Sequence, residues 1–323
     1  DTLFIGDVGR PDLLASIGFT REQLADMLYD SLHDKLMPLP DSTEVWPAHG
    51  AGSACGKNLS TELISTMGEQ RETNYALRAP DKQTFMELVT EGQPPAPSYF
   101  VYDAILNRKE RDLLDEEAMP EAMSYEQVQA ALADGALLID GRTPEEFAQG
   151  HLRQAINVGL EGRYAEFAGS IVPSDVDIVL VTDPGFELEG KNRLGRIGFD
   201  RVIGFLEQPY KVMFQQRDDV QMASRLTAKA FADRLAEMGD LQIVDVRNPG
   251  ELAEGKIGDA VEIPVGQLPD RVGELDVTKP TVVYCAGGYR SSVAASLRRQ
   301  KGVVDVSDII GGYGAYTETV QNA

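Results

Sequence analysis

The sequence Cys285-Ala286-Gly287-Gly288-Tyr289-Arg290-Ser291 joins a short apolar run to a helical pattern. The apolar run, residues 280–284, is rich in β-branched side chains and predicts a buried parallel strand. Residues 292–299 have the composition of a helix. The cysteine is therefore expected where a strand ends, on a tight glycine-containing loop that opens into a helix. A strand, a loop and a helix in this order predict an α/β domain.

The predicted loop has the features of an anion-binding site next to a cysteine. Gly287 and Gly288 allow the loop to curl so that successive N–H groups point inward. The helix N-terminus adds positive potential at the same place, and both effects favour thiolate over thiol at Cys285. Arg290 adds a permanent cation, which we expect to orient an anionic substrate.

A cysteine in such a position has two other possible roles, structural burial and phosphatase catalysis. A buried structural cysteine is the commonest kind, but it needs neither this loop nor an arginine five residues later. A protein tyrosine phosphatase also places Cys and Arg around such a loop, where it holds a phosphate and usually adds a general acid. We favour a reactive cysteine, because the strand end, the glycines and the arginine coincide.

The chain upstream of this stretch contains a second copy of its pattern. Residues 138–151 recur as residues 243–256 without a gap, and the matches are Asp140/Asp245, Arg142/Arg247, Pro144/Pro249, Glu146/Glu251 and Gly150/Gly255. Each copy follows a helix pattern and precedes a second apolar strand, which predicts parallel sheets covered on both faces. We interpret the repeated Asp-x-Arg with its following Glu as a buried charge network that fixes a loop, not as catalytic groups.

The two copies differ where the cysteine stands. Val181-Thr182-Asp183-Pro184-Gly185 occupies the place of residues 284–288, and residues 121–217 contain no cysteine. We therefore predict an inactive domain over residues 121–217 that serves as a spacer or docking element. The active copy is predicted over residues 224–323.

The ring from Cys285 to Arg290, closed by Ser291, resembles the active-site loop of single-domain rhodanese sulfurtransferases. The resemblance implies that Cys285 accepts sulfane sulfur as a persulfide with the help of Arg290. It also implies a persulfide-binding loop made of Ala286, Gly287, Gly288, Tyr289 and Ser291. The ending Ile310-Gly311-Gly312-Tyr313 resembles the closing segment of these domains and is expected to pack beside the mouth of the site.

Residues 1–117 resemble the C-terminal half of an αββα metallo-β-lactamase-fold domain of the glyoxalase II and persulfide dioxygenase branch. The resemblance rests on Asp1-Thr2-Leu3-Phe4, Gly9-Arg10-Pro11-Asp12-Leu13, Pro47-Ala48-His49-Gly50 and Gly52-Ser53-Ala54-Cys55-Gly56. It implies that Asp1 and His49 are metal-site residues, with Fe(II) as the metal and Zn as the alternative. The His-x-His-x-Asp-His cluster of the family's first half is not in this sequence, so we expect that half to be missing from it.

The whole chain thus resembles the rear of a persulfide dioxygenase fused to tandem rhodanese domains. The resemblance implies oxidation of a low-molecular-weight thiol persulfide to sulfite with O₂, coupled through a Cys285 persulfide to thiosulfate. A glyoxalase II-like thioester hydrolase with two zinc ions and a sulfur-sensing module without turnover remain alternatives. Glutathione, coenzyme A and bacillithiol all remain possible carriers of the persulfide, and a homo-oligomer remains possible.

Composition limits the surroundings in which the protein works. The chain has 323 residues, enough for two or three domains, and a net charge of -22 with a pI of about 4.5. This acidity argues against nucleic acid and anionic membrane surfaces as partners. Two cysteines argue against a disulfide framework, so we expect a cytoplasmic protein.

Overall fold

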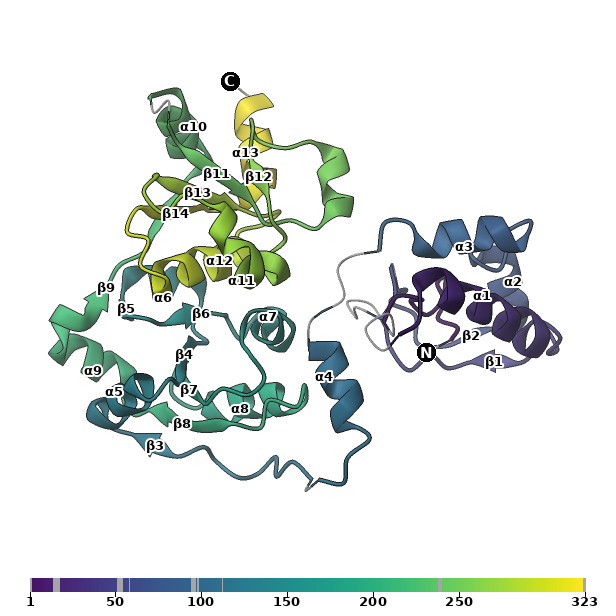
Figure 1. Cartoon of the computed structure of the whole chain (residues 1–323), viewed down its shortest axis with the longest axis horizontal. Coiled ribbons are helices and arrows are strands. Elements are labelled where there is room, and N and C mark those ends of the chain that lie inside the picture. Colours follow the sequence, from purple (N-terminus) through teal and green to yellow (C-terminus); the bar gives the residue numbers. More distant parts are fainter. Residues whose placement is uncertain are drawn as a thin grey trace. The chain divides into compact units, whose positions relative to one another are not determined.

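The computed structural model describes residues 2–13, 18–50, 55–57, 59–93, 97, 99–111, 113–237 and 240–321. The chain forms two compact units, Asp1–Val101 and Tyr102–Ala323 (Figure 1). Helix α4 (Tyr99–Leu106) spans the boundary between them. No helix in these ranges is long and apolar enough to cross a membrane.

The second unit contains two parallel sheets with the same strand order, each five-stranded within the described residues. The first is β3 (Ala122–Met123), β8 (Val202–Leu206), β7 (Ile178–Val181), β4 (Leu137–Asp140) and β6 (Ile156–Asn157). The second is β10 (Ser224–Leu226), β14 (Val306–Ile309), β13 (Thr281–Tyr284), β11 (Gln242–Asp245) and β12 (Val261–Glu262). Strands β7 and β13 are buried throughout, as expected for parallel strands covered on both faces. The predicted duplication is therefore present in the fold.

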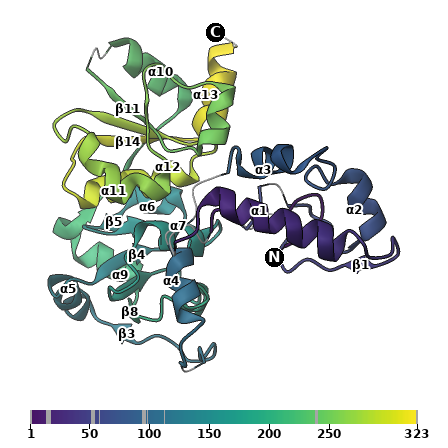
Figure 2. The ribbon, with the colours of Figure 1, turned by 45° about the vertical axis from the view of Figure 1, so that its right-hand side comes forward.

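Helices surround both sheets (Figure 1, Figure 2). The first domain has α5 (Tyr125–Ala133), α6 (Pro144–Gln149), α7 (Tyr164–Ile171), α8 (Glu187–Gly195) and α9 (Pro209–Gln215). The second has α10 (Ala228–Glu237), α11 (Leu268–Arg271), α12 (Tyr289–Gln300) and α13 (Gly312–Gln321), with a 3₁₀ helix over Pro249–Glu254. In the second domain α10 and α13 pack together on one face of the sheet, and α12 lies on the other (Figure 1). A short antiparallel pair, β5 (His151–Leu152) with β9 (Val220–Gln221), lies outside the two sheets.

The two domains of this unit meet where α12 packs on β6, the edge strand of the first sheet (Figure 1, Figure 2). Asn157 of β6 is buried there, and its backbone N–H donates to Ser296 Oγ at 2.9 Å. Its side-chain oxygen accepts from Ser292 Oγ at 2.7 Å. The helix that begins at the cysteine loop is thus held by the domain that has no cysteine.

The first unit is built from short elements around one apolar cluster. Its elements are α1 (Arg21–Ser31), a π-helical turn (Leu32–Leu36), β1 (Glu44–Val45), β2 (Ser65–Thr66), α2 (Met67–Thr73) and α3 (Lys82–Thr90). The core includes Leu3, Val8, Ala25, Leu32, Val45, Met67, Ala76, Leu77, Phe85 and Val89. Thr20 and Gln23 form the capping box of α1, which continues into the π-helical turn.

A short strand precedes helix α2 in this unit. Ser65 and Thr66 pair with β1 as a short antiparallel strand. The helix starts only at Met67, because the Thr66 side chain accepts the Glu69 N–H and caps it there. Near the start of the chain, Leu3 and Val8 form an isolated antiparallel bridge.

Candidate active site

Cys285 lies directly after β13 and before α12, as the sequence pattern predicts. Its side chain is buried, yet it lines a pocket of about 510 Å³. The Gly288 N–H donates to Cys285 Sγ at 3.0 Å, and Ser291 Oγ lies 3.6 Å from the same sulfur. A backbone donor aimed at sulfur favours a negative charge there, so the loop is built to hold an anion.

The curl of the loop depends on Gly288 alone. Gly288 has φ +98°, in the left-handed region that favours glycine, and an added Cβ would lie 3.2 Å from the Gly311 nitrogen. Gly287 has no positive φ, and a Cβ there would meet nothing within 4 Å. The left-handed backbone conformation is therefore present at Gly288 and not at Gly287.

The closing glycine segment packs against the back of this loop. The Tyr313 N–H donates to the Cys285 carbonyl at 2.7 Å, and the Gly314 N–H donates to the Ala286 carbonyl at 3.2 Å. Gly312 has φ +58°, and a Cβ there would lie 2.2 Å from the Cys285 carbonyl oxygen, so no larger residue fits. These bonds occupy the Cys285 and Ala286 carbonyls, while the Gly288 N–H faces the sulfur.

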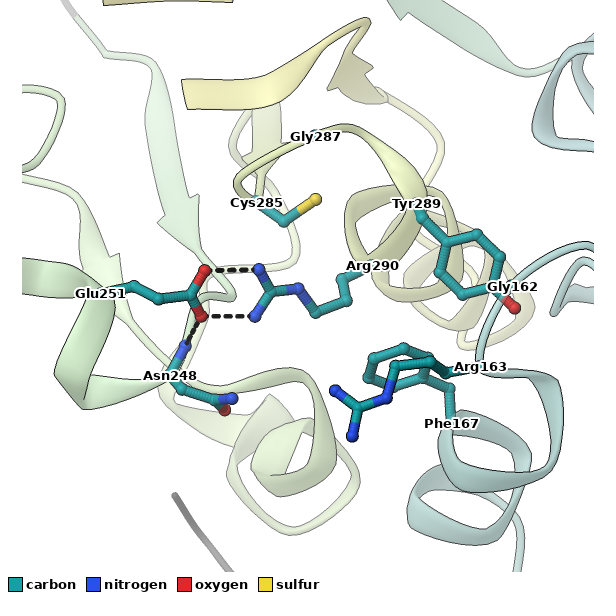
Figure 3. A pocket seen from close by; sticks show the side chains of 9 residues that line it. All are labelled: Gly162, Arg163, Phe167, Asn248, Glu251, Cys285, Gly287, Tyr289 and Arg290. Carbon is teal, nitrogen blue, oxygen red and sulfur yellow. Dashed lines mark hydrogen bonds and ion pairs between the residues drawn. The ribbon is translucent and has the colours of Figure 1, made fainter. Parts of the chain in front are cut away.

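Arg290 is paired with a carboxylate before any substrate binds. Its two terminal nitrogens each lie 2.6 Å from an oxygen of Glu251, in the fork geometry of a bidentate pair (Figure 3). Burial by itself would raise the pKa of Glu251, but the bonds from Arg290 and the Asn248 N–H outweigh it and hold that pKa below its ordinary value. Burial likewise opposes the charge of Arg290, and Glu251 and Cys285 together keep its pKa raised.

Glu251 is a site residue that the sequence interpretation assigned to another role. The predicted charge network is confirmed for Asp245 and Arg247, which form a buried pair at 2.7 Å. Glu251 is not part of that pair, because its carboxylate lies with Arg290 and accepts the Asn248 N–H at 2.8 Å. The available signal was its place in the capping box that opens the 3₁₀ helix, which aims the carboxylate toward the helix start.

A second arginine supports the loop from the sheet side. Arg225 of β10 donates to the Gly288 carbonyl at 3.3 Å and to Asp308 at 3.1 Å, and it also pairs with Glu145 of the first domain. Asp308 in turn accepts from Ser291 Oγ at 3.4 Å. One guanidinium therefore ties the cysteine loop to the neighbouring strand and to the other domain.

The first domain has the same backbone turn with different side chains. Gly185 has φ +97°, close to the value at Gly288. In the two sheets Val181 pairs with Asp140 and Tyr284 pairs with Asp245, so the next residues, Thr182 and Cys285, occupy equivalent positions. Glu187 stands five residues after Thr182, where the second domain has Arg290. Its carboxylate accepts the Gly185 N–H at 2.9 Å. The donor that would face a sulfur is therefore already occupied by an anion of the protein itself.

The pocket is lined by residues from both domains of the second unit. They are Gly162, Arg163, Phe167, Asn248, Glu251, Cys285, Gly287, Tyr289 and Arg290 (Figure 3). Its volume is within the range of small-molecule sites. Of the predicted loop residues, Cys285, Gly287, Tyr289 and Arg290 face it, whereas Ser291 is buried beneath the loop. The residues contributed by the first domain had no signal in the sequence.

The predicted metal residues lie in the first unit. Asp1 is outside the described residues, and the His49 ring lies 6.0 Å from the ring of Phe4. Across the described ranges, no group of three or more His, Cys, Asp or Glu side chains is placed to hold a metal ion. The described residues therefore do not by themselves fit an iron or zinc centre.

Comparison with known proteins identifies the second unit. The profile of the rhodanese-like domain family matches residues 124–208 and 227–319, more than half of the chain. The chain therefore belongs to the rhodanese-like domain family. A sulfurtransferase of Allochromatium vinosum is 34% identical over 91 residues, 28% of this chain and 85% of that protein. Thiosulfate sulfurtransferase GlpE of Shewanella oneidensis is 32% identical over 85 residues, 26% of this chain and 84% of that protein.

A solved structure supports the predicted fold class. A metallo-beta-lactamase from Staphylococcus aureus subsp. aureus COL aligns with a TM-score of 0.54 and 29% identity. The alignment covers 64% of this chain and 56% of that chain, so this chain spans little more than half of that neighbour. The predicted fold class is confirmed: a metallo-β-lactamase-like N-terminal part precedes two rhodanese domains with parallel sheets.

Proposed function

We propose that the second rhodanese domain is a thiosulfate sulfurtransferase in which Cys285 carries the transferred sulfur. The observation that carries the proposal is the contact between the Gly288 N–H and Cys285 Sγ at 3.0 Å, inside a pocket that also holds Arg290. A thiolate is the nucleophile that attacks sulfane sulfur, and an inward N–H stabilises both the thiolate and the persulfide that replaces it.

The reaction takes place in two transfers of sulfur. The Cys285 thiolate attacks the outer sulfur of thiosulfate, the S–S bond breaks, and its electron pair leaves with sulfite. Cys285 then carries a persulfide anion. An acceptor nucleophile, such as cyanide or a thiolate, attacks the outer sulfur of that persulfide. The electron pair of the second broken S–S bond returns to Sγ and restores the thiolate.

Arg290 supports the anionic steps from the start of α12. Its pair with Glu251 fixes the plane of the guanidinium, and the N–H groups not used by that pair remain to meet the donor (Figure 3). We therefore propose that Arg290 is the cation that binds the anionic sulfur donor. The net local charge is lower than a lone arginine would give, because Glu251 belongs to the same site.

The proposal is tested by following one sulfur atom. Incubation with thiosulfate should add the mass of one sulfur to the peptide that contains Cys285, and cyanide should remove it. Cys285→Ser should abolish both the mass gain and turnover, because a hydroxyl is a poor nucleophile toward sulfane sulfur. Cys55→Ser is the control, since Cys55 lies in the first unit, and it should keep the wild-type rate. A Cys285→Ser variant that still turns over thiosulfate would disprove the proposal.

We further propose that this transfer is coupled to oxidation of a thiol persulfide in the cytoplasm. Support comes from the resemblance of the motifs around Asp1 and His49 to persulfide dioxygenases and from the metallo-β-lactamase neighbour. A polypeptide that joins this chain to the family's His-x-His-x-Asp-His half should contain one iron per chain and consume O₂ with glutathione persulfide. Two zinc ions with thioester hydrolysis would instead favour the glyoxalase II-like alternative, and an absence of any turnover would favour a sulfur sensor.

A further inference from the structure

We propose that Arg163, in the domain without a cysteine, binds the carboxylate of the thiol that takes sulfur from Cys285. This inference rests on the proposed sulfur transfer and adds a specificity-determining residue to it. Arg163 precedes α7 and lines the pocket across from Cys285 (Figure 3). Of the described residues that line this pocket, two carry a positive charge, Arg163 and Arg290.

The position of Arg163 is set by contacts between the two domains. Tyr289 of the cysteine loop donates its hydroxyl to the Gly159 carbonyl at 2.6 Å, and its ring lies 5.6 Å from the ring of Phe167. Gly162 makes room for that ring, because an added Cβ would lie 2.4 Å from it. Arg163 follows directly in the chain, so the same contact that anchors Tyr289 places Arg163 at the pocket.

The charges of the two arginines are available to different degrees. Arg290 is held by two hydrogen bonds to Glu251, and its side chain is 16% exposed. Arg163 pairs with Glu166 one turn along its own helix, and its side chain is 49% exposed. Its guanidinium also lies 5.8 Å from the Phe167 ring centre. Glu166 is only 22% exposed, and burial raises its pKa despite the nearby Arg163 guanidinium, which disfavours its ionised form. Because the Arg163 side chain is half exposed, an incoming carboxylate can compete with Glu166 for its guanidinium.

These features indicate the class of acceptor. Thiosulfate and cyanide are small and need only the cysteine loop, whereas the pocket of about 510 Å³ extends to the other domain. The acceptor proposed is a thiol whose sulfur meets Cys285 while its carboxylate meets Arg163, since both residues line the same pocket. In the reaction the acceptor thiolate attacks the outer sulfur of the Cys285 persulfide. The S–S bond breaks, its electron pair returns to Sγ, and the acceptor leaves as a persulfide without any change in net oxidation state.

The test compares two acceptors of similar length, 3-mercaptopropionate, which has a carboxylate, and 2-mercaptoethanol, which has none. Arg163→Gln should raise KM for 3-mercaptopropionate about fivefold, the size expected for one exposed charge pair, and leave kcat unchanged. The constants for 2-mercaptoethanol should stay within about twofold. Arg163→Lys should restore part of the difference, and Glu166→Gln should lower KM for 3-mercaptopropionate because it removes the competing carboxylate.

Arg201→Gln is the matched control, because Arg201 is a similarly exposed arginine of the same domain, 55% exposed and paired with Asp177. Arg201→Gln should change neither KM nor kcat for either acceptor. Loading of wild-type Cys285 by thiosulfate is measured first by mass, and its absence would overturn the proposed function itself. Normal loading together with equal effects of Arg163→Gln on the two acceptors, or with no effect on either, would overturn the role of Arg163 alone.

Discussion

Arg290 and Glu251 form a bidentate ion pair in the wall of the pocket. A repeated glutamate would ordinarily be assigned to the helix start that it caps, and Glu146 of the first domain does only that, accepting from Thr143. Glu251 caps Asn248 in the same way and also holds Arg290 in place. The same residue type at the same repeat position thus has a structural role in one domain and an additional site role in the other.

Glu251→Ala should lower kcat/KM for thiosulfate by about tenfold. The change leaves Arg290 without its two charge-assisted bonds, and a factor of ten corresponds to about 1.4 kcal/mol, reasonable for a partly exposed pair. Glu251→Gln should restore part of the loss, because an amide oxygen can still accept one N–H. Glu146→Ala is the control and should leave steady-state kinetics unchanged. Equal kinetic losses in the two alanine variants would show that Glu251 acts only as a cap.

His151 gives the first rhodanese domain a dependence on pH. It is buried and stacked on Phe147, whose carbonyl accepts from Nδ1 at 2.9 Å. Burial lowers its pKa from 6.5 to about 4. The unfolded chain therefore binds a proton between pH 6.5 and 4 that the folded domain does not bind, so stability is full above pH 6.5 and falls as the pH drops through this window.

The free energy of unfolding should fall by roughly 3 kcal/mol over this range because of His151 alone. His151→Gln should be less stable than wild type at pH 7 but should lose less stability between pH 6.5 and 4. Urea titrations of both proteins at a series of pH values measure the difference. Parallel curves for the two proteins would contradict this assignment.

The strand–loop–helix elements of the two domains show that backbone and chemistry are separable. Gly185 and Gly288 have nearly the same φ, +97° and +98°. In one element the glycine N–H faces the Glu187 carboxylate, and in the other it faces the Cys285 sulfur. The backbone conformation at this glycine is therefore shared by the two domains, whereas the side chain that accepts the glycine N–H differs between them. This agrees with the prediction that the first domain transfers no sulfur, which remains to be tested by activity.

Gly288→Ala should reduce sulfur loading of Cys285 at least tenfold, because a left-handed φ strains alanine and moves the N–H away from Sγ. Gly185→Ala is the matched control, since it has the same φ and an added Cβ would meet nothing within 4 Å. Both variants should lose about 1 kcal/mol of stability from the backbone. If the two variants load sulfur equally well, the N–H of Gly288 has no part in the reaction.

Within the second unit, the two rhodanese domains pack against each other through α12 and β6. The edge strand β6 is covered by α12, which protects the edge of the sheet, and Asn157 satisfies groups on both sides of the contact. Its amide also donates to the Asp140 and Arg142 carbonyls at 3.1 and 2.9 Å. The inert domain therefore supports the helix that starts at the active loop.

Asn157→Ala should lower the free energy of unfolding by about 2 kcal/mol, because buried partners are left unsatisfied. In scanning calorimetry the two rhodanese domains should unfold together in the wild type and in two separable transitions in the variant. Asn107→Ala, at an exposed position, should leave the profile unchanged. Two separable transitions already present in the wild type would show that the contact does not couple the domains.

The sequence alone determined the features that depend on neighbouring residues. The buried strand before Cys285, the loop, the helix that follows and the duplicated Asp-x-Arg motif are local patterns, and each is present as predicted. The start of α2 at Met67 was not predictable in the same way, because it depends on the strand pairing of Ser65 and Thr66 and on the Thr66 cap.

Only the tertiary structure decided which residues share the pocket. Arg290 meets Glu251 from 39 positions away, and Tyr289 meets Gly159 from 130 positions away. Such contacts arise when separate sheets and helices pack, and hydrophobic periodicity records which face of an element is buried but not which element covers it. The cysteine was therefore predictable from its own loop, whereas Arg163 required the packing of one domain on the other.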